Sequence, residues 1–475
     1  MSQAAATIRS VGWLVAAQGS SLVLGFILWA YAARTLGLDS FGQTQLGVAV
    51  GTYLALLAAG GLNLLGISEL GAQYCAQSYV FRIQAIRFAH TFAILAALTA
   101  AAVALPRALS GVIALCAASV VLRELWPEWV DIALGASRRV VLLRTVYFLV
   151  ALSATVMVVQ HATDAAVFGL ILALAAMVVG VPAWLLTLAH LRRLRQPPVE
   201  TRLQLGKGWG AEWTRTMRRA LPLGAASALG LLLANADILI LGALASTSEV
   251  AQYAAAYRII FAIQGVGVAL RLSSLKTLAE PGPQDGREEF ERSLLKVTLL
   301  ASIVVASVAA MVAPYLISLA YGESYRGSIS LLRILVWTWP LDFACTILLN
   351  MLIIRGYRRR YVTSMAAAAA ANLAANALVI PRFGASGAAL VIVASLALLL
   401  VVVFWLAQPS PRSQLLGYLP ATVAMISGLC GSFVANGVSH VIGLGLLALA
   451  STGAMVQLWR LYGSRILARV KPLCL

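Results

Sequence analysis

Two charged residues stand inside apolar runs that are long enough to cross a bilayer. The range 222–270 contains both runs, the first with the acid Asp237 and the second with the base Arg258. Ionisable groups at membrane depth are costly and usually face a cavity or a partner. In adjacent antiparallel helices the two positions differ in depth by about 5 Å, which permits pairing. Two interpretations stay open: a structural ion pair that closes the outer side, or a site where Arg258 binds a phosphate and Asp237 controls its release.

A second group of charges, Arg123, Glu124, Glu128 and Asp131, falls within nine consecutive positions. The three acids follow a spacing of four and then three residues, which predicts that they share one helical face. Pro127 lies between them and predicts a kink. One interpretation places these acids in the solvated cytoplasmic interface. The other is a cation- or proton-coupling face that lines a cavity.

A third group is formed by Arg333 and Asp342, with Arg34 at the end of the first apolar run. On an unbroken helix Arg333 and Asp342 point to opposite sides, so both reach one cavity only if Pro340 bends the helix. Asp342 is predicted near the middle of the membrane. Arg34 and Arg333 are predicted near the outer surface, where they either extend toward the headgroups or line an outer cavity.

The composition indicates that the elements that position these charges are membrane-spanning helices. The chain has 475 residues, of which 61% are hydrophobic and 11% charged, and its mean hydropathy is +0.90. Soluble proteins carry about 25% charged residues. Apolar runs of about 20 residues, the length of a transmembrane helix, recur along the whole chain. We therefore predict an all-α polytopic membrane protein.

The apolar runs predict fourteen spans. Their approximate limits are 11–33, 43–66, 88–106, 109–135, 145–160, 165–190, 220–243, 249–272, 295–320, 328–353, 362–380, 386–407, 415–435 and 440–457. The first run is too long for the core of a signal peptide. We predict an N-terminal lobe of six spans (1–190), a basic cytoplasmic linker (191–219), a second six-span lobe (220–408), and two final spans with a basic tail (409–475).

Lys and Arg concentrate in every second connection, including the linker and the C-terminal tail. The positive-inside rule then places both termini in the cytoplasm. The same bias accounts for the net charge of +18, which we attribute to topology and to anionic membrane lipids rather than to a nucleic acid. We expect no nucleic-acid partner.

No arrangement typical of an enzyme is present. The sequence lacks the G-x-x-x-x-G-K-[ST] pattern of an ATP site, and its five Cys and four His are scattered without metal-ligand spacing. We expect a protein that is not an enzyme and that needs no metal and no cofactor.

Four stretches together resemble one family. They are AARTLGLDSFGQTQLG (32–47), PEWVDIALGASRRVVLLRT (127–145), ANADILILGALASTSEVAQYAAAYRI (234–259) and IPRFGASGAALVIVASLAL (380–398). With fourteen spans and cytoplasmic termini, the sequence is similar to the polysaccharide transporter family. This is the Wzx-type O-antigen or oligosaccharide-lipid flippase branch of the multidrug/oligosaccharidyl-lipid/polysaccharide (MOP) exporter superfamily.

The resemblance implies a MATE-like fold, in which two six-helix lobes surround a central cavity that opens alternately to each side. It implies a polyprenyl-pyrophosphate-linked oligosaccharide as substrate, a bacterial cytoplasmic membrane as location, and polysaccharide polymerase and chain-length proteins as candidate partners. The candidate substrate-binding residues are Arg258, Arg34, Arg123 and Arg333. The candidate gating or ion-coupling residues are Asp237, Glu124, Glu128, Asp131 and Asp342.

Three alternatives stay open. An ion-coupled drug or cation antiporter of the same superfamily would share the topology, but its cavity should be acidic and aromatic. A membrane-embedded glycosyltransferase or polymerase usually has a long outer loop, whereas the predicted outer loops here do not exceed about ten residues. The last alternative is an assembly partner that transports nothing.

Overall fold

The computed structural model describes residues 3–70, 77–104, 111–193, 209–262, 284–407, 423–432, 442 and 445–457. Within these ranges the regular structure is helical and contains no strand. Eight of the described helices are long and apolar enough to cross a membrane, and Val423–Ser432 and Gly445–Gln457 are shorter apolar helices. Each of the fourteen predicted spans overlaps a described helix. The predicted all-α polytopic architecture is confirmed.

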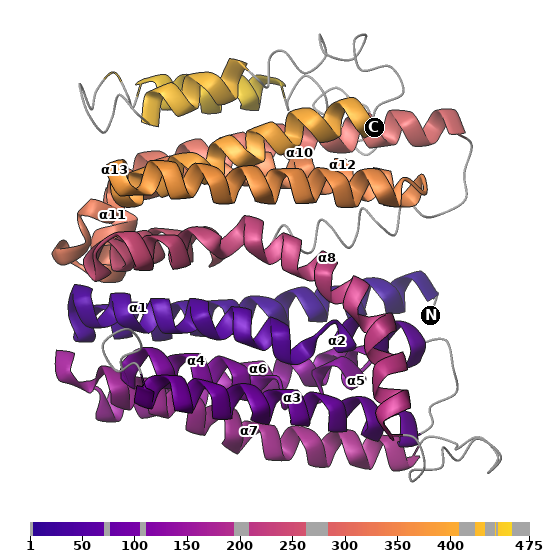
Figure 1. Ribbon diagram of the computed structural model, residues 1–475. Coiled ribbons are helices and arrows are strands. Elements are labelled where there is room, and N and C mark those ends of the chain that lie inside the picture. Colours follow the sequence, from indigo (N-terminus) through magenta and orange to yellow (C-terminus); the bar gives the residue numbers. More distant parts are fainter. Residues whose placement is uncertain are drawn as a thin grey trace, which may run out of the picture. The chain divides into compact units, whose positions relative to one another are not determined.

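The chain divides into two compact units, Met1–Ala251 and Gln252–Leu475. The helices of the first unit are α1 (Gln3–Ala59), α2 (Leu62–Leu70), α3 (Gln77–Ala104), α4 (Gly111–Arg123), α5 (Glu128–Ala133), α6 (Ser137–Val158), α7 (Ala165–Arg193) and α8 (Trp209–Leu244) (Figure 1). A 3₁₀ turn, Ala162–Asp164, precedes α7. Helix α1 contains the first two predicted spans. Gly37, with φ 73° and ψ 178°, separates one from the other.

Hydrogen bonds and close approaches show the relative directions of these helices. Ser21 bonds to Thr145 at 3.1 Å and the Tyr31 hydroxyl donates to the Val159 carbonyl at 3.2 Å. The first half of α1 therefore runs parallel to α6. The second half of α1 runs parallel to α4, because Gly47 packs on Ile113 and the later Gly51 packs on Ala117. The predicted spans one and five thus share one direction, and spans two and four share another.

Helix α8 runs antiparallel to the second half of α1 and to α2. Tyr53 donates its hydroxyl to the Leu231 carbonyl at 3.4 Å, and Gly61 lies against Ala220 and Gly224. The helix begins at Trp209, well before the predicted start of the seventh span at residue 220. Its early turns pack on the unit rather than extending away, since Trp213 and Met217 contact a buried apolar cluster that includes Leu62 and Trp129.

The second unit contains a helical segment over 247–262, most of which belongs to it, followed by α10 (Gln284–Tyr321), α11 (Gly327–Leu335), α12 (Thr338–Ile354) and α13 (Arg358–Ala407). A 3₁₀ turn, Glu323–Tyr325, lies between α10 and α11. Gly384, with φ 54° and ψ −139°, divides α13 into the eleventh and twelfth predicted spans. The tenth span is divided between α11 and α12, so its helix breaks at residues 336–337, before Pro340.

We predict that Gly61→Ala destabilises the protein by about 2 kcal/mol or more, because an L side chain is strained at its φ of 81°. A Cβ atom there would also lie 2.1 Å from the Ala220 carbonyl oxygen, so α2 and α8 must separate. Thermal unfolding of the full chain in detergent measures the loss. Gly230→Ala on α8, which has open space around it, is the control. Equal melting temperatures for the two variants would contradict the prediction.

Candidate functional site

The fourth predicted span is broken in the middle. Helix α4 ends at Arg123, a turn follows, and α5 begins at Glu128 directly after Pro127. The predicted kink at Pro127 is confirmed. The prediction that Glu124, Glu128 and Asp131 share one helical face is wrong, because Glu124 lies in the turn outside both helices, whereas Glu128 and Asp131 belong to α5.

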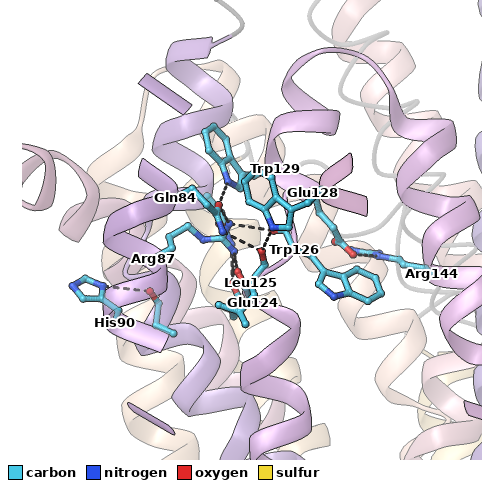
Figure 2. Close-up of polar contacts among 12 residues, drawn as sticks. Gln84, Arg87, His90, Glu124, Leu125, Trp126, Glu128, Trp129 and Arg144 are labelled. Carbon is cyan, nitrogen blue, oxygen red and sulfur yellow. Dashed lines mark hydrogen bonds and ion pairs between the residues drawn. The ribbon is translucent and has the colours of Figure 1, made fainter. Parts of the chain in front are cut away.

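The break leaves backbone carbonyl groups without helical partners, and side chains of α3 bind them (Figure 2). Arg87 donates to the carbonyl oxygen of Glu124 and, at 3.3 Å, to that of Trp126. Gln84 donates to the carbonyl of Leu125 at 3.1 Å. An unsatisfied backbone group away from water costs several kcal/mol, so irregular backbone at membrane depth needs such partners.

Two tryptophans fix the same turn from other directions. Trp184 of α7 donates its indole N–H to the Leu125 carbonyl at 2.9 Å. Trp129 of α5 donates to Gln84 Oε1 at 3.1 Å, and this oxygen also accepts a 2.8 Å bond from Arg87 (Figure 2). The turn is therefore connected to α3, α5 and α7 by hydrogen bonds. These bonds hold the backbone from which the charged side chains Arg123, Glu124 and Glu128 extend.

Both glutamates at the break are neutralised by arginines from other helices. The Arg87 side chain is only 3% exposed and contacts the Glu124 carboxylate at 3.0 Å. Asn63 of α2 also donates to that carboxylate, at 3.3 Å. Arg144 of α6 holds Glu128 in a two-point contact, with Nε–Oε1 at 3.1 Å and Nη2–Oε2 at 2.6 Å (Figure 2). This geometry is the strong, planar form of a guanidinium–carboxylate pair.

Arg123 is held differently. Its guanidinium carbon lies 5.1 Å from the centroid of the Tyr147 ring and 5.7 Å from that of Trp126. Its Nε is buried without a hydrogen-bond partner. Between residues that the structure describes, the polar contacts show no ion pair for this guanidinium. Aromatic faces attract a guanidinium but leave its N–H groups without an acceptor.

A cavity of about 500 Å³ opens beside the break, bounded by α1, α2, α4, α5, α6 and α8. Its charged lining residues are Arg123, Glu124, Glu128 and Arg144, and its polar lining includes Thr52, Asn63 and Ser227. When Arg87 behind Glu124 is included, three guanidinium groups face two carboxylates. The group therefore has one positive charge in excess, and Arg123 is its guanidinium that forms no ion pair with a described carboxylate.

The sequence suggested Arg123, Glu124 and Glu128 as site residues, and the structure places all three along this cavity. It did not suggest Arg87 and Arg144, which looked like cytoplasmic loop residues of the positive-inside pattern. Their positions were the only signal for a role at this site: each arginine directly precedes a predicted span, Arg87 the span 88–106 and Arg144 the span 145–160.

Asp131 does not line the cavity. Its buried carboxylate accepts a 3.0 Å hydrogen bond from Thr187 of α7 and lies 3.6 Å from Arg139. Arg139 in turn contacts His190 Nδ1 at 2.9 Å. These contacts connect α5 to α6 and α7, so the geometry gives Asp131 a packing role in this unit.

The other predicted site residues lie elsewhere. Asp237 belongs to α8 in the first unit, is 2% exposed, and accepts a 2.9 Å bond from the N–H of Ile238. Arg258 belongs to the second unit, where it interacts electrostatically with Tyr321 of α10. Pairing of Asp237 with Arg258 stays a prediction.

Arg34 is exposed near the end of the first half of α1. Arg333 is buried in α11, with Nε 3.4 Å from the Ala310 carbonyl, and Asp342 is half-buried in α12. The two residues between α11 and α12 keep right-handed helical dihedral angles, so whether Arg333 and Asp342 reach one cavity stays a prediction. Within the described ranges, His, Cys, Asp and Glu side chains form no group of three or more that fits a metal ion.

Solved structures of membrane proteins share the fold of this chain. A structure described as "Lipid II flippase MurJ, inward closed conformation" is similar with a TM-score of 0.71 at 11% identity, covering 94% of this chain and 98% of that one. An inward-facing multidrug resistance MATE family transporter of the MOP superfamily is similar with a TM-score of 0.53 at 16% identity, covering 84% and 94%. At such low identity the likeness shows the fold, and the predicted MATE-like fold is confirmed. The chain is a multi-pass membrane protein with a transporter fold.

Comparison of the sequence with known families identifies the family of this chain. Residues 7–271, more than half of the chain, match the family described as "Polysaccharide biosynthesis protein". The chain belongs to the polysaccharide biosynthesis protein family. No curated protein sequence matches it.

We predict that Arg87→Met destabilises the protein by about 3–5 kcal/mol, because it leaves the Glu124 carboxylate without its counter-charge and two backbone carbonyls without the arginine donor. Arg82→Met on the same helix is the matched control. Arg82 pairs with Glu212 at 3.5 Å in a more exposed setting, so its loss should cost at most about 1 kcal/mol. Thermal unfolding of both variants in detergent is the measurement, and similar losses would show that Arg87 does not support the break.

Proposed function

We propose that this protein is a flippase in the cytoplasmic membrane of a bacterium. It moves a polyprenyl-pyrophosphate-linked oligosaccharide from the inner to the outer leaflet by alternating access, for the synthesis of a cell-surface polysaccharide such as O-antigen or exopolysaccharide. Family membership and the transporter fold support the proposal. The observation that carries it is the cavity of about 500 Å³ within the helices of the first unit, which has four charged lining residues, among them an arginine that no carboxylate pairs.

The substrate explains why such a cavity is needed. Sugar hydroxyls and a pyrophosphate cannot enter the hydrocarbon core without losing their hydrogen bonds and counter-charges. A flippase must supply both along its path while the polyprenyl tail stays in the lipid. Intramembrane arginines suit this task, because the guanidinium binds phosphate and carboxylate groups at two points and stays charged when buried.

The candidate residues divide into two roles in this proposal. Arg258, Arg34 and Arg333 bind the pyrophosphate, and Arg123 acts at the cavity of the first unit. Asp237 and Asp342 remain the candidates for gating or ion coupling. Glu124 and Glu128 are each held by an arginine, which suits them better to shaping the cavity than to carrying a cation.

An ion-coupled drug or cation antiporter is the alternative, since MATE transporters share the fold. The charge of the cavity argues against it. A cationic drug would meet Arg123 and Arg144 on the cavity wall, and the two carboxylates there are already paired with Arg87 and Arg144. In the flippase proposal both termini are cytoplasmic, anionic lipids contact the basic cytoplasmic surface, and polymerase and chain-length proteins receive the product.

We predict that Arg258→Ala lowers translocation of a fluorescent polyprenyl-pyrophosphate oligosaccharide in liposomes by about tenfold or more. A charge-assisted hydrogen bond to a phosphate contributes on the order of 1.5–3 kcal/mol. Arg258→Lys should recover only part of the rate, since an ammonium group lacks the two-point geometry. Arg326→Ala is the control, because this arginine is exposed and pairs with Glu323.

Unchanged translocation by Arg258→Ala would remove this residue from the site. If the wild-type protein moves no lipid-linked oligosaccharide but expels cationic dyes along an imposed ion gradient, the antiporter replaces the flippase as the function.

A further inference from the structure

The charges at the cavity of the first unit are not equivalent. Arg87 and Arg144 are each engaged by a carboxylate, whereas Arg123 is held by the rings of Tyr147 and Trp126. The Nε of Arg123 is buried and has no hydrogen-bond partner. Arg123 lines the cavity, so a ligand there reaches the other N–H groups of the guanidinium, which no carboxylate of the described residues holds.

We propose that the cavity binds the carboxylate of an acidic sugar, of the uronic acid class, in the oligosaccharide that the protein moves. This inference rests on the proposed flippase function and goes beyond it, because it names the chemical class of the saccharide. Arg123 binds the carboxylate, and the cavity receives one part of the oligosaccharide rather than the lipid-linked pyrophosphate.

The balance of charge distinguishes a carboxylate from a pyrophosphate. The cavity has one uncompensated positive charge, which matches one carboxylate. A pyrophosphate carries more than one negative charge, and it would leave the excess uncompensated next to Glu124 and Glu128. Like charges at this short range repel each other, which disfavours the second negative charge of a pyrophosphate. A neutral sugar would leave Arg123 itself without a counter-charge.

The geometry of the arginine also suits a carboxylate. Two aromatic rings hold the guanidinium of Arg123, and a stacked guanidinium retains its edge N–H groups for a planar acceptor. Arg144 already shows a two-point contact with a carboxylate in the same cavity, that of Glu128. A uronate carboxylate on Arg123 repeats this arrangement with a ligand in place of a protein side chain.

The size and the remaining lining fit a sugar ring. A volume of about 500 Å³ falls in the range of about 300–1,000 Å³ that is typical of small-molecule sites. Thr52, Asn63 and Ser227 place hydroxyl and amide groups on the cavity wall. The two hydroxyls donate to the carbonyls of Val48 and Leu223, and the Asn63 amide donates to Glu124. Their oxygens remain to accept hydrogen bonds from sugar hydroxyls, which replaces part of the water that the sugar loses on entry.

Two assays on the full chain test the inference. The first measures binding of a glucuronate-containing disaccharide and of its neutral glucose counterpart to the purified protein in nanodiscs. The second measures translocation in liposomes of two polyprenyl-pyrophosphate oligosaccharides that differ only in this one sugar. We compare wild type with Arg123→Gln, with Arg123→Lys, and with the control Arg192→Gln, which changes an exposed arginine at the end of α7.

The acidic ligand should be preferred about tenfold or more by wild type and by Arg192→Gln. Arg123→Gln should abolish the preference, and Arg123→Lys should retain part of it, because the charge remains while the two-point contact is lost. Melting temperatures of the variants identify any that fail to fold, and Arg123→Lys then carries the comparison.

Two results would overturn the inference. Wild type that binds and moves both substrates equally has no acidic-sugar site. Arg123→Gln that slows both substrates by the same factor shows that Arg123 binds the pyrophosphate, which the two share. If wild type moves neither lipid-linked substrate, the flippase proposal fails, while the disaccharide assay still decides whether the cavity selects a carboxylate.

Discussion

The first unit depends on how three backbone carbonyls are satisfied where its fourth predicted span breaks. The carbonyls of Glu124, Leu125 and Trp126 lie in a turn between two helices of a membrane protein, where missing hydrogen bonds are costly. Side chains of α3 and α7 supply the donors. The break can therefore persist, and it presents charged groups of one span to a cavity. Discontinuous helices serve this purpose at the binding sites of many transporters.

The pairing of arginines with glutamates sets the charge of the cavity. Each glutamate at the break has an arginine from a neighbouring helix, and the remaining charge belongs to Arg123. The fold by itself does not define the substrate, because the structures that share it include a lipid II flippase and a multidrug transporter. The substrate must be inferred from the few charged side chains that the helices hold at the cavity, and these favour an anion.

Glycines allow the walls of this cavity to approach closely. Gly47 and Gly51 of α1 pack directly on the backbone of α4, and Gly180 of α7 lies against the Trp126 ring. Gly61 brings the start of α2 to the backbone of α8. Small residues at helix interfaces are a common means of association in membranes, where no hydrophobic effect drives helices together.

The sequence alone determined the all-helical membrane fold, the approximate spans, the kink at Pro127 and the family resemblance, because hydropathy, proline and local motifs are recorded in consecutive residues. It also singled out Arg123, Glu124 and Glu128, since charges in apolar runs are rare. Only the tertiary structure identified Arg87 and Arg144 as partners, which lie 37 and 16 positions from their glutamates. It also directed Asp131 toward Thr187 and placed the break before Pro340. These features depend on which helices pack together and at what rotation, and the periodicity of a single helix contains no information about its neighbours.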